Sequence, residues 1–111
     1  MTASCHSIEL PFPPAALSPN ARCHWSVRAK AAKSYRKACW ALSKQAGLAV
    51  DWDGPVHLTL TFYPPSRRHY DMDGLISRMK SGLDGVADAI GIDDVNFVLH
   101  PVLSVQIQGR V

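Results

Sequence analysis

The order of patterns along the sequence predicts an α+β fold, in which two main helices pack on a small mixed β-sheet. Residues 25–46 and 73–90 carry apolar side chains at helical spacing, and residues 55–64 alternate apolar and polar side chains as a strand does. Shorter strand-like segments stand at both ends of the chain. At 111 residues the chain suffices for one hydrophobic core, so we expect a single domain over residues 1–111.

The first half predicts a strand, a loop and a helix. SIELPF (7–12) alternates polar and apolar residues and predicts the strand, and the proline-rich stretch 13–20 predicts the loop because proline lacks a ladder donor. The helix that follows ends near Gly47. Its apolar face carries Val27, Ala31, Tyr35, Ala38, Cys39, Leu42 and Ala46, and its opposite face carries Lys30, Lys33, Lys37 and Lys44.

The second half predicts a strand, a helix, a turn and a closing strand region. In PVHLTLTFYP (55–64) alternate side chains share one face, and PPSRRHY (64–70) predicts a basic loop. Gly91 marks the end of the second helix, IDDVN (92–96) predicts a turn, and residues 97–111 predict one or two strands interrupted near Pro101. The expected core stripe of that helix is Leu75, Ile76, Met79, Leu83, Val86 and Ile90.

Composition indicates a globular protein of the cytoplasm. The apolar fraction of 47% is too high for disorder, and no continuous apolar run is long enough for a membrane span. The N-terminal sequence shows no basic segment followed by an apolar run, so we expect no secretory signal. Three cysteines, Cys5, Cys23 and Cys39, without a Cys-x-x-Cys pair indicate reduced thiols.

Charge is distributed unevenly about a net value of +3. Between Glu9 and Asp51 there is no acidic residue, whereas the second half holds all eight aspartates. This asymmetry predicts a surface for a polyanion beside a carboxylate cluster; two solvated faces of a small domain are the alternative.

Acidic residues stand at both ends of the second predicted helix. Asp71 and Asp73 precede or open it, and Asp93 and Asp94 follow it. On a helical wheel Asp73, Lys80 and Asp84 lie within about 40° of one another. The helix is about 27 Å long, so its two acidic ends can meet only if the chain doubles back.

Such carboxylates suit Mg²⁺ or Mn²⁺, hard cations that prefer carboxylate oxygen and water. The bound ion would activate a water and stabilise charge on a phosphate, and a lysine would add to that stabilisation. The plainer alternative is an N-cap before the helix and a common Asp-Asp turn after it, with Asp84 and Asp88 solvated.

Cations surround the same segment. Arg67, Arg68 and His69 lie within a few residues of Asp71, in a position to bind phosphates of a nucleic acid. The lysine face of the first helix would extend that contact through Lys30, Lys33 and Lys37, and Asn20 and Arg22 through the segment before it. Trp25 is a candidate for base stacking or, as is commoner, for packing at the start of the helix.

Three blocks in this order resemble the RusA family of Holliday junction resolvases, in its phage and prophage form. They are LPFPPAALSPNARCHW with the lysine-rich helix, RRHYDMDGLISRMKSGLDGVADA, and GIDDVNF, and together they cover most of the chain. Gly74 departs from the family pattern, which usually has Asn after the second aspartate.

The resemblance implies a homodimeric, Mg²⁺-dependent endonuclease that cuts four-way DNA junctions. It implies that Asp71, Asp73 and Asp94 bind the metal and that Lys80 is the catalytic lysine. The expected partner is therefore branched DNA, with no membrane, and Mn²⁺ is expected to substitute for Mg²⁺. A branched-DNA-binding protein of the same fold, catalytically weak or silent because of Gly74, is the alternative.

Overall fold

The computed structural model describes residues 7–49 and 54–111 and has the predicted α+β fold, with two helices packed against a small sheet. Helix α1 spans Trp25–Gln45 and helix α2 spans Met72–Ile90; strands β1 (Val56–Phe62) and β2 (Phe97–Leu103) form the sheet. Short 3-10 helices, η1 (Ala15–Leu17) and η2 (Asp94–Asn96), stand in the segments predicted as loop and turn. Cys5, Asp51 and Asp53 lie outside the described residues.

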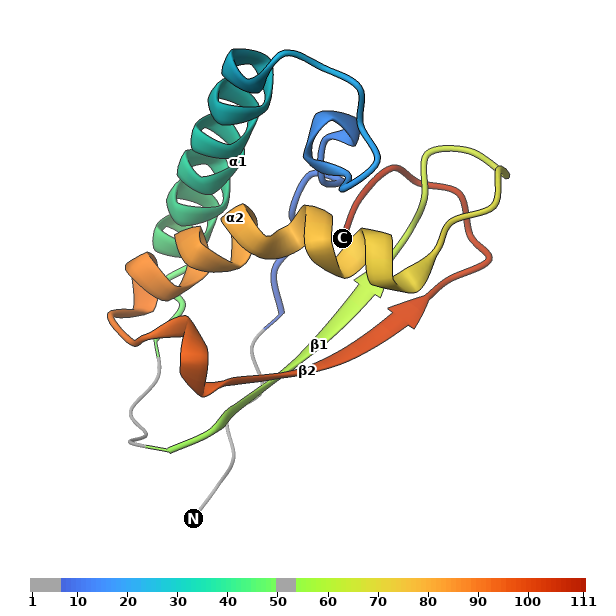
Figure 1. Cartoon of the computed structure of the whole chain (residues 1–111). Helices are drawn as coiled ribbons and strands as arrows, with labels where there is room; N and C mark the ends of the chain where they lie inside the picture. The colour runs from blue at the N-terminus through green and yellow to red at the C-terminus, as the bar shows by residue number, and fades with distance from the viewer. Residues whose placement is uncertain (1–6, 50–53) are drawn as a thin grey trace.

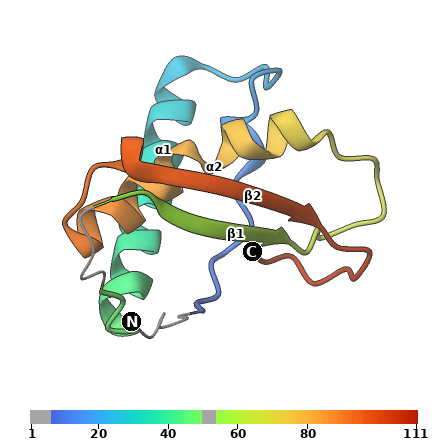
Figure 2. The same ribbon diagram turned by 90° about the horizontal axis from the view of Figure 1, so that it is seen from below.

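The sheet consists of β1 and β2 in parallel, with α2 as the connection between them. Both helices lie on one side of the sheet, and Figure 2 shows its other side uncovered in front of them. That open side carries His57 and His100, whose stacked rings approach to 2.8 Å between Nδ1 and Nε2. Within the described chain, no helix is long and apolar enough to cross a membrane.

Two predicted strand segments differ from the structure. The segment 7–12 is not a strand: Pro11 forms one isolated antiparallel bridge with Arg110, which also bridges Tyr63. Prolines at 11 and 13 remove donors there, so a ladder is not sustained. Antiparallel pairing, the mixed part of the predicted sheet, is thus limited to these bridges.

Pro101 does not interrupt the closing strand, because β2 runs through it in register with Leu60. Ser104 N donates to Phe62 O at 2.9 Å, so alternate positions of β2 face β1 and Pro101 points away from it. Because the N–H that proline lacks would lie on the outer side of this edge strand, all the hydrogen bonds of the ladder can still form.

The core lies between α1, α2 and the inner face of the sheet (Figure 1). Tyr35 and Cys39 of α1 meet Gly82 of α2, where an added Cβ would stand 2.5 Å from the Tyr35 ring. The Tyr35 hydroxyl donates to the carbonyl oxygen of Pro11 at 2.7 Å, which ties the N-terminal segment to the helices. The buried residues are Leu10, Leu17, Tyr35, Cys39, Leu60, Phe62, Leu75, Met79, Leu83, Val86 and Val111.

The apolar face of α1 is buried less than its pattern predicts. Val27 is 51% exposed and Ala46 is also exposed, since the helix packs chiefly through its middle. Both helix ends agree with the sequence: Ala46 is the C-cap of α1, and Gly91 ends α2 with φ of 75°, a left-handed conformation that favours glycine.

Candidate functional site

The start of α2 presents two exposed carboxylates. Asp71 is the N-cap residue, but its side chain makes no capping hydrogen bond, and Asp73 lies in the first turn. Asp71 thus takes the N-cap position of the plainer interpretation, but without a side-chain capping bond, so its carboxylate is available for another contact. Unpaired N–H groups at the helix start favour negative charge on both side chains.

Lys80 and Asp94 meet on the side of α2, two turns beyond Asp73. The Lys80 ammonium donates to the Asp94 carboxylate and, at 3.1 Å, to Oδ1 of Asp84. The chain therefore doubles back along α2, and it brings Asp94 to Lys80. Figure 1 shows the cause: after α2 the chain turns through η2 and re-enters the sheet as β2.

These contacts alter the protonation of both groups. The hydrogen bond from Lys80 lowers the pKa of the Asp94 carboxyl. The bonds to Asp94 and then Asp84 raise the pKa of the Lys80 ammonium. The two groups are charged together over the whole neutral range. The side chain of Lys80 is 67% exposed, so solvent screens the pair and its main effect is to position Asp94.

Asp93 and Asp84 have roles that the sequence did not assign to them. Oδ1 of Asp93 accepts a hydrogen bond from Val95 N at 3.1 Å and caps η2, which holds the turn that carries Asp94. Asp84 shares the Lys80 ammonium and is 25% exposed, so it is not simply solvated. The helical wheel already placed Asp84 near Lys80, but only the structure joins them.

Asp88 forms a separate brace between the helices. The Arg36 guanidinium donates to both carboxylate oxygens of Asp88, at 2.7 and 3.0 Å. This bidentate contact lowers the pKa of Asp88. Asp88 is therefore structurally engaged, on the same helix as the candidate site but away from Lys80.

The carboxylates have the right chemistry for Mg²⁺ but are not gathered into one group. Within residues 7–49 and 54–111, no three His, Cys, Asp or Glu side chains are arranged to hold a metal ion. Asp71 and Asp73 stand at the start of α2, while Asp94 is bound to Lys80. The donor set fits a hard cation, and the described arrangement does not fit a three-carboxylate centre.

A small pocket adjoins the Lys80–Asp94 contact. It measures about 210 Å³, and its walls come from α2, η2 and β2. Lys80 and Asp94 are its charged residues, and the other lining residues are Ile76, Leu83, Phe97 and Leu99. The pocket thus combines one ion pair with apolar walls, as small-molecule sites commonly do.

The residues predicted to bind DNA are exposed. The lysines of α1 lie on the side opposite Tyr35 and Cys39, so they face away from α2. None of the predicted cations forms an ion pair with another residue of the described chain. The exposed set is Asn20, Arg22, Lys30, Lys33, Lys37, Arg67, Arg68 and His69.

Trp25 lies at the first position of α1 and is 75% exposed, so the prediction that it packs at the start of the helix is wrong. Its indole lies against the His24 ring, with centroids 5.4 Å apart. His24 is the N-cap, and its Nδ1 accepts from Ser26 N at 3.2 Å. An exposed aromatic pair beside the cationic side of α1 is a surface on which a base can stack.

Comparison with known proteins identifies a relative of this chain. No protein-family model matches the chain. A protein of Xylella fastidiosa (strain Temecula1), named as an uncharacterized protein, is 42% identical over 105 residues, which cover 92% of this chain and 69% of the relative. At that identity and coverage, the chain belongs to the same family as the Xylella fastidiosa protein.

Proposed function

We propose that the protein is a Mg²⁺-dependent endonuclease of branched DNA, which hydrolyses phosphodiesters in four-way junctions as the resemblance to RusA resolvases implies. The observation that carries the proposal is the contact between Lys80 and Asp94. It unites a residue of the second acidic motif with the helix that begins with Asp71 and Asp73.

The proposed ligands are Asp71, Asp73 and Asp94, and Mn²⁺ would substitute for Mg²⁺. When bound, the ion would supply Lewis-acid stabilisation of a phosphate and an activated water. In the described arrangement Asp94 is engaged by Lys80. Lys80 itself stays cationic at neutral pH, which suits it to a negatively charged phosphate.

The DNA surface in this proposal consists of the exposed cations around that helix. Arg67, Arg68 and His69 precede the acidic segment and form no ion pair within the described residues. Such exposed side chains are suited to phosphate contacts, which fix register without reading sequence. Two symmetric cuts in one junction require two active sites, so we propose a homodimer. We further propose a cytoplasmic setting, for which the free thiols of Cys23 and Cys39 are suited.

The test is cleavage of synthetic four-way junctions in Mg²⁺. We expect wild-type protein to cut them, and Asp73→Asn and Asp94→Asn each to lower the rate at least about a hundredfold. Asp88→Asn is the matched control, because it removes a carboxylate of the same helix that is engaged by Arg36. Absence of cutting by wild type, or equal rates for Asp73→Asn and Asp88→Asn, would contradict the assignment.

A second function, junction binding without cutting, is favoured by two observations. The three candidate carboxylates do not form one group in the described chain, and Gly74 lacks a side chain beside Asp71. A Cβ at position 74 would meet Asp71 Oδ2 at 3.9 Å, an ordinary contact, so Gly74→Asn fits. If wild type binds junctions without nicking them and Gly74→Asn nicks them, the glycine is the lesion.

A further inference from the structure

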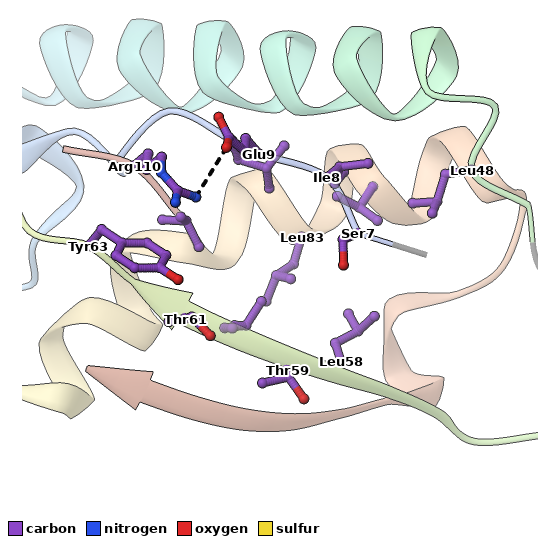
Figure 3. Close-up of a pocket in the computed structure, with 14 residues that line it drawn as sticks. Ser7, Ile8, Glu9, Leu48, Leu58, Thr59, Thr61, Tyr63, Leu83 and Arg110 are labelled. Carbon is purple, nitrogen blue, oxygen red and sulfur yellow. Dashed lines mark ion pairs between the residues drawn. The ribbon is translucent and has the colours of Figure 1, made fainter. Parts of the chain in front are cut away.

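An apolar groove of about 600 Å³ separates the N-terminal segment 7–10 from the edge of β1 that faces away from β2 (Figure 3). Leu83 and Val86 contribute to the groove from α2, and Leu48 contributes from the segment after α1. Strand β1 contributes Leu58, Thr59, Leu60 and Thr61. The opposite wall consists of Ser7, Ile8, Glu9 and Leu10. Two extended backbones therefore flank an apolar space.

Arg110 and Val111 already lie between these two backbones at one end of the groove. Arg110 exchanges two backbone hydrogen bonds with Tyr63, at 2.8 and 2.9 Å, and Val111 exchanges two with Leu10, at 2.8 and 2.9 Å. The Arg110 guanidinium stacks on the Tyr63 ring at 4.0 Å and pairs with Glu9 at 3.4 Å. Together they form two residues of a strand paired on both sides.

The register of this pairing extends into the groove. In an antiparallel ladder, hydrogen-bonded pairs recur every second residue, so the pair after Tyr63–Arg110 falls at Thr61 and the next at Thr59. On the other wall the pair after Leu10–Val111 falls at Ile8. Within the described chain, no backbone hydrogen bond from outside the sheet reaches Thr59 or Thr61.

The side-chain phase is fixed as well. Val111 is buried in the core with Leu10 and Phe62, so alternate residues after it would face the same way. The second residue after Val111 would lie between Leu60 and Ile8, and the fourth beside Leu58. These two positions require apolar side chains, whereas the first and third would face outward and tolerate polar ones.

We propose that the groove is the seat of an additional β-strand, formed by residues joined to Val111 and running antiparallel to β1. A strand there would satisfy the open edge of β1 and cover the apolar floor at once. The Xylella fastidiosa relative has residues outside the shared region, since the match covers 69% of that protein. The proposal does not depend on the nuclease function.

The experiment adds six residues, Thr-Val-Glu-Val-Lys-Ile, after Val111 of the full chain. These place apolar side chains at the second, fourth and sixth positions. We expect Tm to rise by about 5 °C. We also expect amide exchange of Thr59 and Thr61, followed by NMR, to slow at least about tenfold.

Two control extensions of equal length separate pairing from added length. Val-Thr-Val-Glu-Ile-Lys reverses the phase and directs the apolar side chains outward. Pro-Val-Pro-Val-Lys-Ile keeps the phase but removes the donors opposite Thr61 and Thr59. Both should leave Tm and exchange near those of the unextended chain. Equal protection by all three extensions, or none by the first, overturns the proposal. Protection by the first peptide added unlinked at equal concentration also overturns it, because the strand would then need no connection to Val111.

Discussion

The Lys80 ammonium binds the carboxylate of Asp94, fourteen residues further along the chain, and thereby fixes the turn after α2 against the middle of that helix. Asp93 supports the same turn through its bond to Val95 N. The two neighbouring aspartates thus have different contacts: Asp93 accepts a backbone hydrogen bond within the turn, and Asp94 binds Lys80.

The Lys80–Asp94 contact predicts an abnormal titration of Asp94. Its pKa lies below the ordinary 3.8, so the contact persists above that value and is lost only as pH falls through the lowered pKa. The pKa of Lys80 is raised above the ordinary 10.5. The contact is therefore kept at pH 10.5 and is lost only when the pH rises through the raised pKa. In Lys80→Met, the pKa of Asp94 should return toward 3.8, and NMR titration of the carboxyl group measures it. Asp88, held by Arg36, is the internal control and should stay low. If the pKa of Asp94 stays low in this variant, another group sets it.

Glycines of α2 should differ in their response to alanine. A Cβ at Gly85 would stand 2.2 Å from the Arg36 carbonyl oxygen, so Gly85→Ala should lower the free energy of unfolding by about 3 kcal/mol. A Cβ at Gly74 would make only ordinary contacts with Asp71, so Gly74→Ala should raise that free energy by about 0.5–1 kcal/mol through helix propensity. Urea unfolding measures both. Similar effects at the two positions would mean that α1 is not so close to α2.

The cysteines of α1 and of the segment before it should differ in reactivity. Cys23 is exposed, whereas Cys39 is fully buried and its burial raises the thiol pKa to about 11. In a Cys5→Ser background, a thiol reagent at neutral pH should modify Cys23 at once. Cys39 should react at least about a thousandfold more slowly, because the reagent reaches it only when the structure opens. Unfolding in urea should equalise the two rates, and rapid modification of both without urea would contradict the buried position.

The side chain of Arg67 should contribute to DNA affinity through contacts with phosphates rather than with bases. If the proposed function holds, Arg67→Ala weakens binding to branched and linear DNA alike and lowers the slope of log K against log salt by about 1. Lys44→Ala is the control, since Lys44 is an exposed cation at the far end of α1. An unchanged salt slope in Arg67→Ala, or an equal loss in the control, would place the DNA elsewhere.

The sequence predicted the helices and β1 well because each has a strong local signal. The apolar spacing of α2 and the glycine at position 91 predict where this helix ends. The alternation of side chains from Val56 to Phe62 predicts β1. The N-terminal segment also alternates, yet it is not a strand. A strand depends on a partner, and here the partner is only Arg110 and Val111.

For the candidate site, the sequence by itself determined which charged groups are available and led to the prediction of their roles: the aspartates around α2, Lys80 on the same helix, and the cations before it. The tertiary structure decided their partners. Asp94 joins Lys80 and Asp84, Asp88 joins Arg36, and Asp71 has a side chain free of capping. Helical periodicity fixes neighbours three or four residues apart, whereas contacts across fourteen or fifty-two residues depend on how the chain returns through the sheet.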